Sequence, residues 1–415
     1  MADFSSRVWN NERIYMVDFG RAPNSYHPTS MCPDIDRYGY TDDNNNSEHG
    51  PAMSCAVGQN QVKVEFYRTE ISTAAKLYAI PADGNTTVRM LSPTTTDALP
   101  ATRNTTLVFK PRAAGRTAIE IRYQWPDGPV IGRLYVDVRA FRQIRARVHL
   151  VTVAGTPLPA SFLGQPAPAH TAAATHQTNV MTKLFRDTNR VLWPHGVNLV
   201  NVDTFNTNWA AALFGPANYA IPHPSAPGAI PGWLRVMRAM ALSPNRSANR
   251  LNIYIADTAA MVAAGVAVGN MVGLGPPRPW AGNAGIGATW PNPTTGGNSM
   301  GTGIWIHAQY AINGQILAHE VGHILLLCSV AGTGAVNQWH STGDFAVSRD
   351  DYLTRRRLMY NITTLLNSND TWRNDVGFGG NMGALLTQRG LARDGTLQES
   401  RRAYNSCVAA NLYVP

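Results

Sequence analysis

The sequence predicts an α+β protein of two domains: an N-terminal antiparallel β-sandwich over residues 1–142, and a domain of mixed strands and helices over residues 143–415. Three observations carry this prediction. At 415 residues the chain exceeds the size that one hydrophobic core usually serves. Its first third contains short segments in which apolar and polar residues alternate, as they do in half-buried strands. Beyond about residue 142, strands are mixed with segments of helical period.

In the first domain the predicted strands are 62–68, 117–123 and 133–139. Val62, Val64 and Phe66 would share one face of the first, and the turn sequence WPDGP separates the other two. Several strands at such short spacing favour an antiparallel sandwich, of which an immunoglobulin-like arrangement is one candidate form.

In the second domain we expect strands at 145–153, 197–202, 250–257, 284–290 and 303–310. A helix is predicted over 176–193, where Val180, Leu184 and Val191 mark one face, and another near 233–240. The last strand leads into an apolar segment, LAHEVGHILLL, at residues 317–327.

Composition limits the partners of the chain. It is 44% hydrophobic and 15% charged, as folded proteins are, and no segment approaches the roughly 18 apolar residues of a membrane span. The net charge of +9 is scattered rather than gathered in blocks, so we expect no nucleic-acid partner.

The start, MADFSSRVWNNERIY, has no apolar stretch typical of a signal peptide. Of the 35 basic residues only four are lysine, which suits a protein delivered into foreign cytosol as well as a GC-rich genome. We therefore expect secretion or injection by a leaderless route, with a cytoplasmic protein as the alternative.

The segment His319-Glu320-Val321-Gly322-His323 carries the candidate chemistry. Residues four apart lie one above the other on a helix, so His319 and His323 can direct nitrogens at one metal ion. Glu320 turns about 100° away and can act as a general base. Glutamate is scarce here: Glu320 is the only one between residues 121 and 398. A buried helix whose histidines merely form hydrogen bonds is the plainer interpretation.

A catalytic zinc site commonly takes three protein ligands, so a third ligand is needed. His340 is the single histidine after His323 and is the natural choice; Asp344 is the runner-up. A downstream glutamate would have to be Glu399, near the chain end.

With this motif the sequence resembles the metzincin superfamily of zinc metalloproteases, which combine an HExxH helix, a third histidine soon after it and a methionine turn beneath the metal. RRRLMYNIT resembles that turn, with Met359 as its methionine. The order of elements before the helix is similar to the metzincin sheet, with two backing helices and an antiparallel edge strand, here 284–290. The chain differs in having Leu326 and Ser329 where the family has glycine and histidine.

The resemblance implies a zinc-dependent endopeptidase. Zn²⁺ would be held by His319, His323 and His340, Glu320 would be the general base, and the substrate would be a protein or peptide. An exported bacterial toxin or effector, with a secretion-system carrier as a candidate partner of the first domain, fits this interpretation. The alternative is a non-catalytic binding or structural accessory protein with a degenerate metalloprotease fold.

Other residues receive structural interpretations. His149, His195 and His307 lie in or beside predicted strands and are expected to be structural. Four cysteines allow three pairings, and a bridge between Cys32 and Cys55 would close one polar loop. Cys328 is expected to pack as a small apolar residue.

Overall fold

The chain divides into two compact units. Unit 1 comprises residues 1–142, 192–197 and 385–404, and unit 2 comprises residues 143–191, 198–384 and 405–415. They contain antiparallel and mixed sheets together with separate helices, so the fold class is α+β. The computed structural model describes residues 6–9, 12–15, 17–22, 30–31, 35, 40–41, 47–48, 50–158, 173–214, 232–247, 250–268, 273–274, 303–308 and 314–325.

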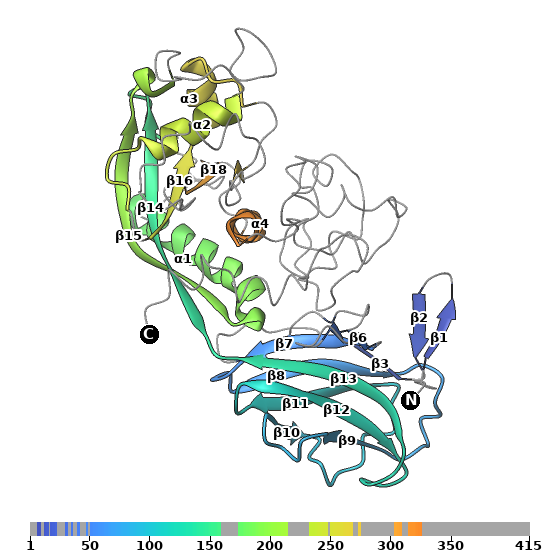
Figure 1. Ribbon diagram of the computed structural model, residues 1–415. Coiled ribbons are helices and arrows are strands. Elements are labelled where there is room, and N and C mark those ends of the chain that lie inside the picture. The colour runs from blue at the N-terminus through green and yellow to red at the C-terminus, as the bar shows by residue number, and fades with distance from the viewer. Residues whose placement is uncertain are drawn as a thin grey trace. The chain divides into compact units, whose positions relative to one another are not determined.

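Unit 1 is built from two main sheets and two small hairpins (Figure 1). One sheet has the order β10-β11-β8-β3, with β4 also paired to β8, and the other has the order β7-β13-β12-β9. The hairpins are β1–β2 and β5–β6. The strands are β1 (Ser6–Trp9), β2 (Glu12–Tyr15), β3 (Val17–Arg21), β4 (Ser30–Met31), β5 (Tyr40–Thr41), β6 (Ser47–Glu48), β7 (Ala52–Ala56), β8 (Gln61–Arg68), β9 (Leu77–Pro81), β10 (Val88–Ser92), β11 (Asn104–Pro111), β12 (Gly115–Tyr123) and β13 (Val130–Arg139).

The two main sheets share one hydrophobic core. Phe66 of β8 and Leu107 of β11 enter it from the first sheet, and Ile119 of β12 enters it from the second; all three are fully buried. Apolar side chains reach the core from alternate positions because successive side chains of a strand point to opposite faces. Strands β8, β12 and β13 confirm the segments predicted at 62–68, 117–123 and 133–139. An immunoglobulin-like order stays a prediction.

Two pairings in unit 1 are parallel, which differs from the predicted antiparallel sandwich. Strand β13 pairs with β7 in parallel, with Val138 opposite Cys55, and β4 pairs with β8 in parallel. Alternation within a strand reports which face is buried but not which distant strand is its neighbour. Cys55 is a free, fully buried cysteine, and its proposed partner Cys32 lies outside the described residues, as do Cys328 and Cys407.

Unit 2 is organised around a five-stranded mixed sheet of order β15-β14-β16-β18-β17. Strands β14, β16 and β18 are parallel to one another, whereas β17 is antiparallel to β18 and forms an edge. Four of these strands confirm predicted segments. The strands are β14 (Arg142–Val153), β15 (Val197–Trp209), β16 (Leu251–Ala256), β17 (Gly273–Leu274) and β18 (Ile304–His307).

Four described α-helices and a short 3₁₀ helix accompany this sheet (Figure 1). Val180, Leu184 and Val191, the predicted face of the first helix, are buried in α1. Helices α2 and α3 contribute to a core cluster that includes Trp209 of β15 and Trp305 of β18. The helices are α1 (Ala173–Leu192), α2 (Gly232–Ala241), α3 (Thr258–Ala263) and α4 (Gly314–Ile324); the 3₁₀ helix η3 (Ala211–Phe214) belongs to unit 2, and η2 (Trp193–His195) to unit 1.

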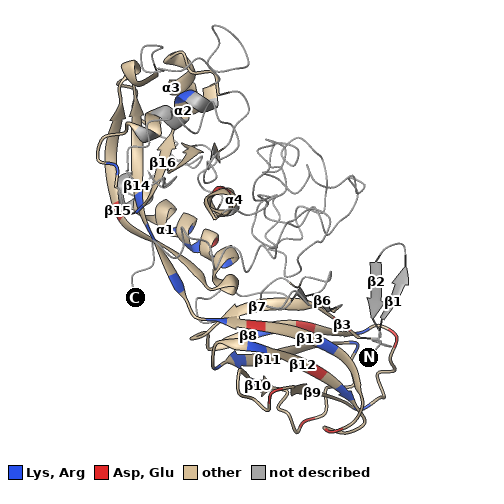
Figure 2. Cartoon of the chain, in the orientation of Figure 1, with Lys and Arg blue, Asp and Glu red and all other residues tan. Residues whose placement is uncertain are grey.

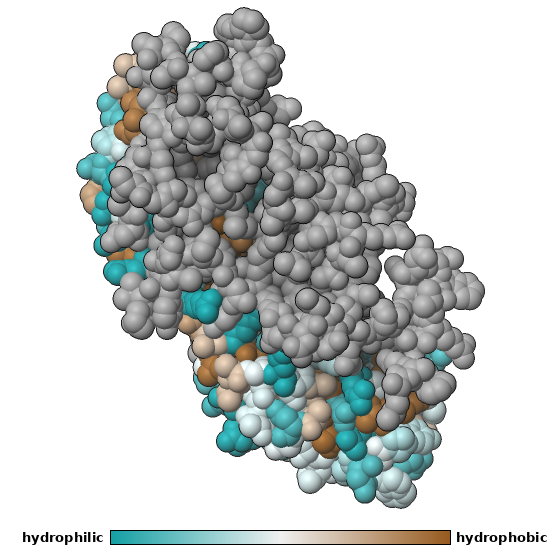
Figure 3. Space-filling view, viewed as in Figure 1, coloured by the Kyte–Doolittle hydropathy of each residue, from teal (hydrophilic) through white to brown (hydrophobic). Residues whose placement is uncertain are grey.

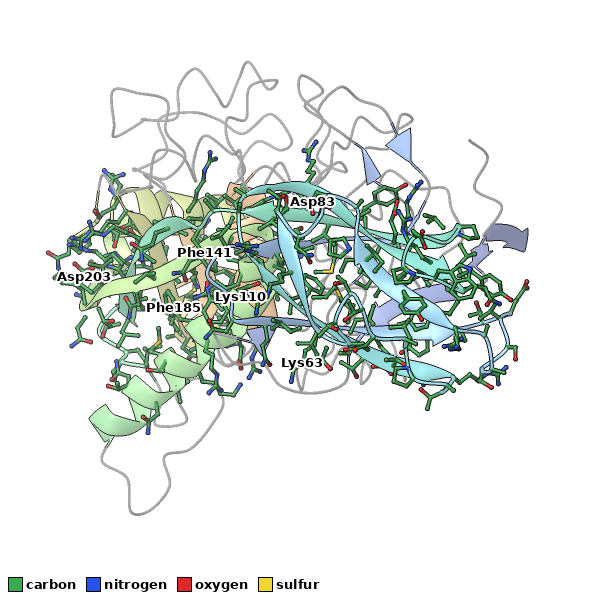
Figure 4. All side chains as sticks on the ribbon, turned by 90° about the horizontal axis from the view of Figure 1, so that it is seen from below. Lys63, Asp83, Lys110, Phe141, Phe185 and Asp203 are labelled. Atoms are coloured by element: carbon green, nitrogen blue, oxygen red, sulfur yellow. The ribbon has the colours of Figure 1, made fainter. Side chains whose placement is uncertain are left out.

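Charged side chains also connect the strands of unit 2. Asp203 of β15, labelled in Figure 4, accepts hydrogen bonds from Arg147 of β14 at 2.9 Å (Nε to Oδ1) and 2.8 Å (Nη2 to Oδ2). Arg250, just before β16, also pairs with Asp203. Both arginines hold the pKa of the Asp203 carboxyl below its usual value. The cluster connects the middle of β14 and of β15 to the beginning of β16.

The described surface of unit 1 mixes residue types. Figure 2 shows acidic and basic residues interspersed along β8, β12 and β13, and Figure 3 shows hydrophilic and hydrophobic residues intermixed over the same unit. Trp125, in the β12–β13 turn, is 60% exposed. Among the described helices, none has the length and apolar character needed to cross a membrane.

Candidate metal-binding helix

The HExxH motif lies on α4 (Gly314–Ile324), within its buried part. From Ile316 to Leu325 every residue is buried. A helix with apolar residues on most of its faces is typical of a protein core, and the helix sequence GQILAHEVGHI is rich in apolar residues. Three titratable side chains are therefore held away from water. Burial of such groups is costly unless they are hydrogen-bonded, paired or bound to a metal, and for this reason α4 is the candidate site.

His319 and His323 occupy the same face of α4, one turn apart. Their ring centroids are 4.8 Å apart, with an angle of 85° between the ring planes. They are 1% and 6% exposed, respectively. Residues four apart on a helix are stacked along its axis, which explains the spacing. Two imidazoles this close can direct one nitrogen each at a common ion.

Glu320 is 4% exposed and lies beneath the edge strand β17. A methyl group at Gly273 would lie 2.5 Å from Glu320 Oε1 and 2.9 Å from both Cδ and Cγ. The backbone of β17 therefore approaches the carboxylate so closely that a side chain at position 273 would require Glu320 to move. Sequence periodicity did not find this strand, because two residues are too few to show a period.

Helix α1 supports the beginning of α4 (Figure 1). The Thr188 hydroxyl lies 3.0 Å from the Gly314 carbonyl oxygen and 2.8 Å from that of Leu184, and it can donate to either. A methyl group at Gly314 would lie 2.5 Å from the Thr188 backbone nitrogen. The absence of a side chain at Gly314 thus allows the two helices to approach backbone to backbone.

The two histidines of α4 are suitable as part of the ligand set of a zinc site. Imidazole nitrogens are common zinc ligands, and catalytic zinc sites combine three protein ligands with an open position. His319 and His323 supply two of the three. Within the ranges that the structure describes, no group of three or more His, Cys, Asp or Glu side chains forms a complete metal site.

Several predicted site residues lie outside the described residues. These are His340, the runner-up Asp344, the Met-turn residue Met359 and the predicted edge strand 284–290. Each stays a prediction. The described antiparallel edge strand, β17, lies earlier in the chain, at Gly273–Leu274.

His149 is a structural residue in the core of unit 2, as predicted. Its Nδ1 lies 2.9 Å from Thr207 Oγ1 and its Nε2 lies 3.2 Å from Asn252 Oδ1, and its ring stacks on Tyr254 at 4.4 Å between centroids. Asn252 is oriented by Ser247, whose backbone nitrogen donates to the same Oδ1. Since Oδ1 can only accept, Nε2 carries the proton. Burial lowers the pKa of His149 to about 4.

His195 and His307, the other two histidines predicted to be structural, differ in how deeply they are buried. His195 of η2 is buried in unit 1, with Nδ1 3.0 Å from Ser54 Oγ. Burial, assisted by the Arg139 cation, lowers its pKa to about 3. His307 at the end of β18 is partly exposed, and burial lowers its pKa against the opposing effect of Asp257.

Comparisons with known proteins leave the family open. No protein-family model and no curated protein matches the chain. Domains 4 and 5 of the S-layer protein SbsC align at 16% identity and a TM-score of 0.17, covering 26% of this chain and 54% of that one. A structure described as a chaperone-substrate complex aligns at 11% identity and a TM-score of 0.30, covering 74% of this chain and 43% of that one. The chain thus spans about half the length of these two solved chains, and neither TM-score supports an argument about fold or function.

Proposed function

We propose that the chain is a zinc-dependent endopeptidase of the metzincin type, with Glu320 as general base. The observation that carries the proposal is the burial of His319, Glu320 and His323 side by side on one helix. Three titratable groups in a dry, rigid setting are typical of a site that performs chemistry.

The surroundings of α4 add support. The helix lies against β17 and β18, and β17 is an edge strand antiparallel to β18, whereas β14, β16 and β18 are parallel to one another. Helix α1 packs against the beginning of α4 through Thr188 and Gly314. A mixed sheet, backing helices and an antiparallel edge strand beside the motif helix are the features expected of a metzincin-like domain.

The residues divide the chemistry between them. His319 and His323 would hold the zinc as neutral imidazoles, together with His340 or, failing that, Asp344. When bound, zinc polarises a peptide carbonyl and lowers the pKa of a coordinated water to about 7. The Glu320 carboxylate accepts the proton of the attacking water and returns it to the leaving amine. The apolar flanks Val321, Ile324 and Leu325, all buried, exclude bulk water from the motif.

Replacement of Glu320 tests the base directly. In Glu320→Gln the side chain keeps its size but loses its basicity, so we expect hydrolysis of casein or gelatin to fall about 10²–10⁴-fold while zinc stays bound. Glu65→Gln, at a buried glutamate in β8 of unit 1, is the matched control and should keep full activity. Metal analysis of the purified full chain accompanies both assays.

The outcomes separate the two functional classes. Stoichiometric zinc with activity lost only in Glu320→Gln supports the peptidase. Zinc without measurable hydrolysis by the wild type would favour a non-catalytic accessory protein. Equal activity of wild type and Glu320→Gln would contradict the assignment of the base.

The third ligand requires its own variants. We expect His340→Ala to lower zinc affinity by at least the 10–100-fold that loss of a supporting partner costs, and Asp344→Ala to leave it near the wild-type value. The reverse result would assign the ligand to Asp344. Delivery as an effector, through a carrier that binds unit 1, stays a prediction.

A further inference from the structure

We propose that Gly273 is a positioning residue that holds the Glu320 carboxylate in place. The inference rests on the proposed function, since it assigns the edge strand a role in placing the general base. It concerns a contact in unit 2 between β17 and α4.

The geometry of this contact is tight. A Cβ at position 273 would stand 2.5 Å from Glu320 Oε1 and 2.9 Å from Cδ and Cγ, well inside van der Waals contact. Strand β17 is fixed at this point because Gly273 is paired with Ile306 and Leu274 with Trp305 of β18. The carboxylate thus rests against a backbone that is anchored to the sheet.

The need for glycine here is spatial and not conformational. Gly273 is not among the described glycines with positive φ, so alanine could adopt its backbone conformation. The three nearest atoms that an added methyl group would meet belong to the Glu320 side chain, which can rotate away. We therefore expect Gly273→Ala to fold and to displace the carboxylate.

Displacement of a general base has a distinct kinetic signature. A misplacement of about 1 Å can cost about 100-fold in rate. In Gly273→Ala we expect kcat to fall about 100-fold with KM changed less than about threefold, because the lost contribution belongs to the chemical step. Bound zinc should match the wild type, since the predicted clash is with the carboxylate.

A thermal unfolding cycle tests the contact without metal or activity. Gly273→Ala should lower the Tm of the unit 2 transition in the metal-free chain by about 2–4 °C in the wild-type background. In the Glu320→Ala background the methyl group has room, so the same substitution should cost less than about 1 °C. The difference between backgrounds also cancels the effect of alanine on the unfolded chain.

Gly20→Ala is the matched control. Gly20 lies in β3 of unit 1, lacks a positive φ, and its Cβ would lie 2.9 Å from Tyr67 Cε2, again the far part of a side chain. It should lower the Tm of the unit 1 transition by the same small amount in both backgrounds and leave kcat at the wild-type value.

An equal Tm loss for Gly273→Ala in both backgrounds, or a kcat within about threefold of wild type, would overturn the inference. A wild type that hydrolyses no peptide would instead overturn the proposed function. In that event the unfolding cycle still decides whether Gly273 positions the carboxylate.

Discussion

At the scale of single residues, the neighbours of a buried histidine indicate its role. His149 and His195 are buried next to hydroxyl or amide partners, and burial depresses their pKa values. Both groups are thus kept neutral for structural reasons. His319 and His323 are buried too, but they lie beside each other and beside a carboxylate. This grouping, rather than burial, distinguishes a candidate ligand pair from a core histidine.

The depressed pKa of His195 predicts acid sensitivity of unit 1. Its pKa is 6.5 in the unfolded chain and about 3 in the folded one, so below pH 6.5 the unfolded state binds more protons. The stabilising effect of neutral His195 is complete above pH 6.5 and is lost as the pH falls towards 3. Between pH 6.5 and 4.5 we expect a loss on the order of 2–3 kcal/mol.

The measurement is the free energy of unfolding at several pH values for the wild type and His195→Asn. The asparagine Oδ1 can still accept from the Ser54 hydroxyl but does not titrate in this range. The variant should therefore show a shallower acid loss. Parallel curves for the two proteins would contradict the assignment of acid sensitivity to this residue.

At the scale of secondary-structure elements, the close contact between α1 and the beginning of α4 should determine the position of α4. The methyl group of Gly314→Ala would collide with backbone atoms of Asp187 and Thr188, which cannot rotate away. We expect a loss of about 1–3 kcal/mol in the free energy of unfolding, as for other overpacked sites, together with weaker zinc binding. Denaturant titration and metal competition measure the two effects.

Thr188→Val provides the comparison for that contact. It removes the hydroxyl that can donate to Gly314 without adding volume at the helix crossing. It should cost about 1 kcal/mol and change zinc affinity less than Gly314→Ala does. If both variants left zinc binding unchanged, α1 would not determine the position of the motif helix.

Elements also differ in how far the sequence could predict them. Local periodicity predicted which side chains are buried, and the structure confirms it in two elements. The first is the alternation of Val62, Val64 and Phe66 in β8, and the second is the helical spacing of Val180, Leu184 and Val191 in α1. The parallel pairing of β13 with β7 and the two-residue strand β17 depend on distant partners and have no local period. The motif spacing predicted a shared face for His319 and His323, whereas the closeness of Gly273 to Glu320 follows from tertiary packing alone.

At the scale of the whole molecule, each unit has a hydrophobic cluster of its own among the described residues. The core shared by the two main sheets of unit 1 lies within residues 17–138, and the cluster around Trp209, Tyr254 and Trp305 lies within unit 2. A unit with its own core usually unfolds cooperatively by itself. We therefore expect two thermal transitions in calorimetry of the full chain.

Each transition should respond to a different perturbation. Phe66→Ala opens a cavity in the core of unit 1 and should lower one transition, with a cost of about 3–5 kcal/mol, while leaving bound zinc unchanged. A chelator should lower the other, because zinc stabilises the folded state that binds it by about 4 kcal/mol when present at 1,000 times its Kd. A chelator that shifted the transition sensitive to Phe66→Ala, or neither transition, would contradict the placement of the metal site on α4. The Phe66→Ala substitution and the chelator each serve as the control for the other. Calorimetry with both therefore tests the division into two units and the location of the zinc site in one experiment.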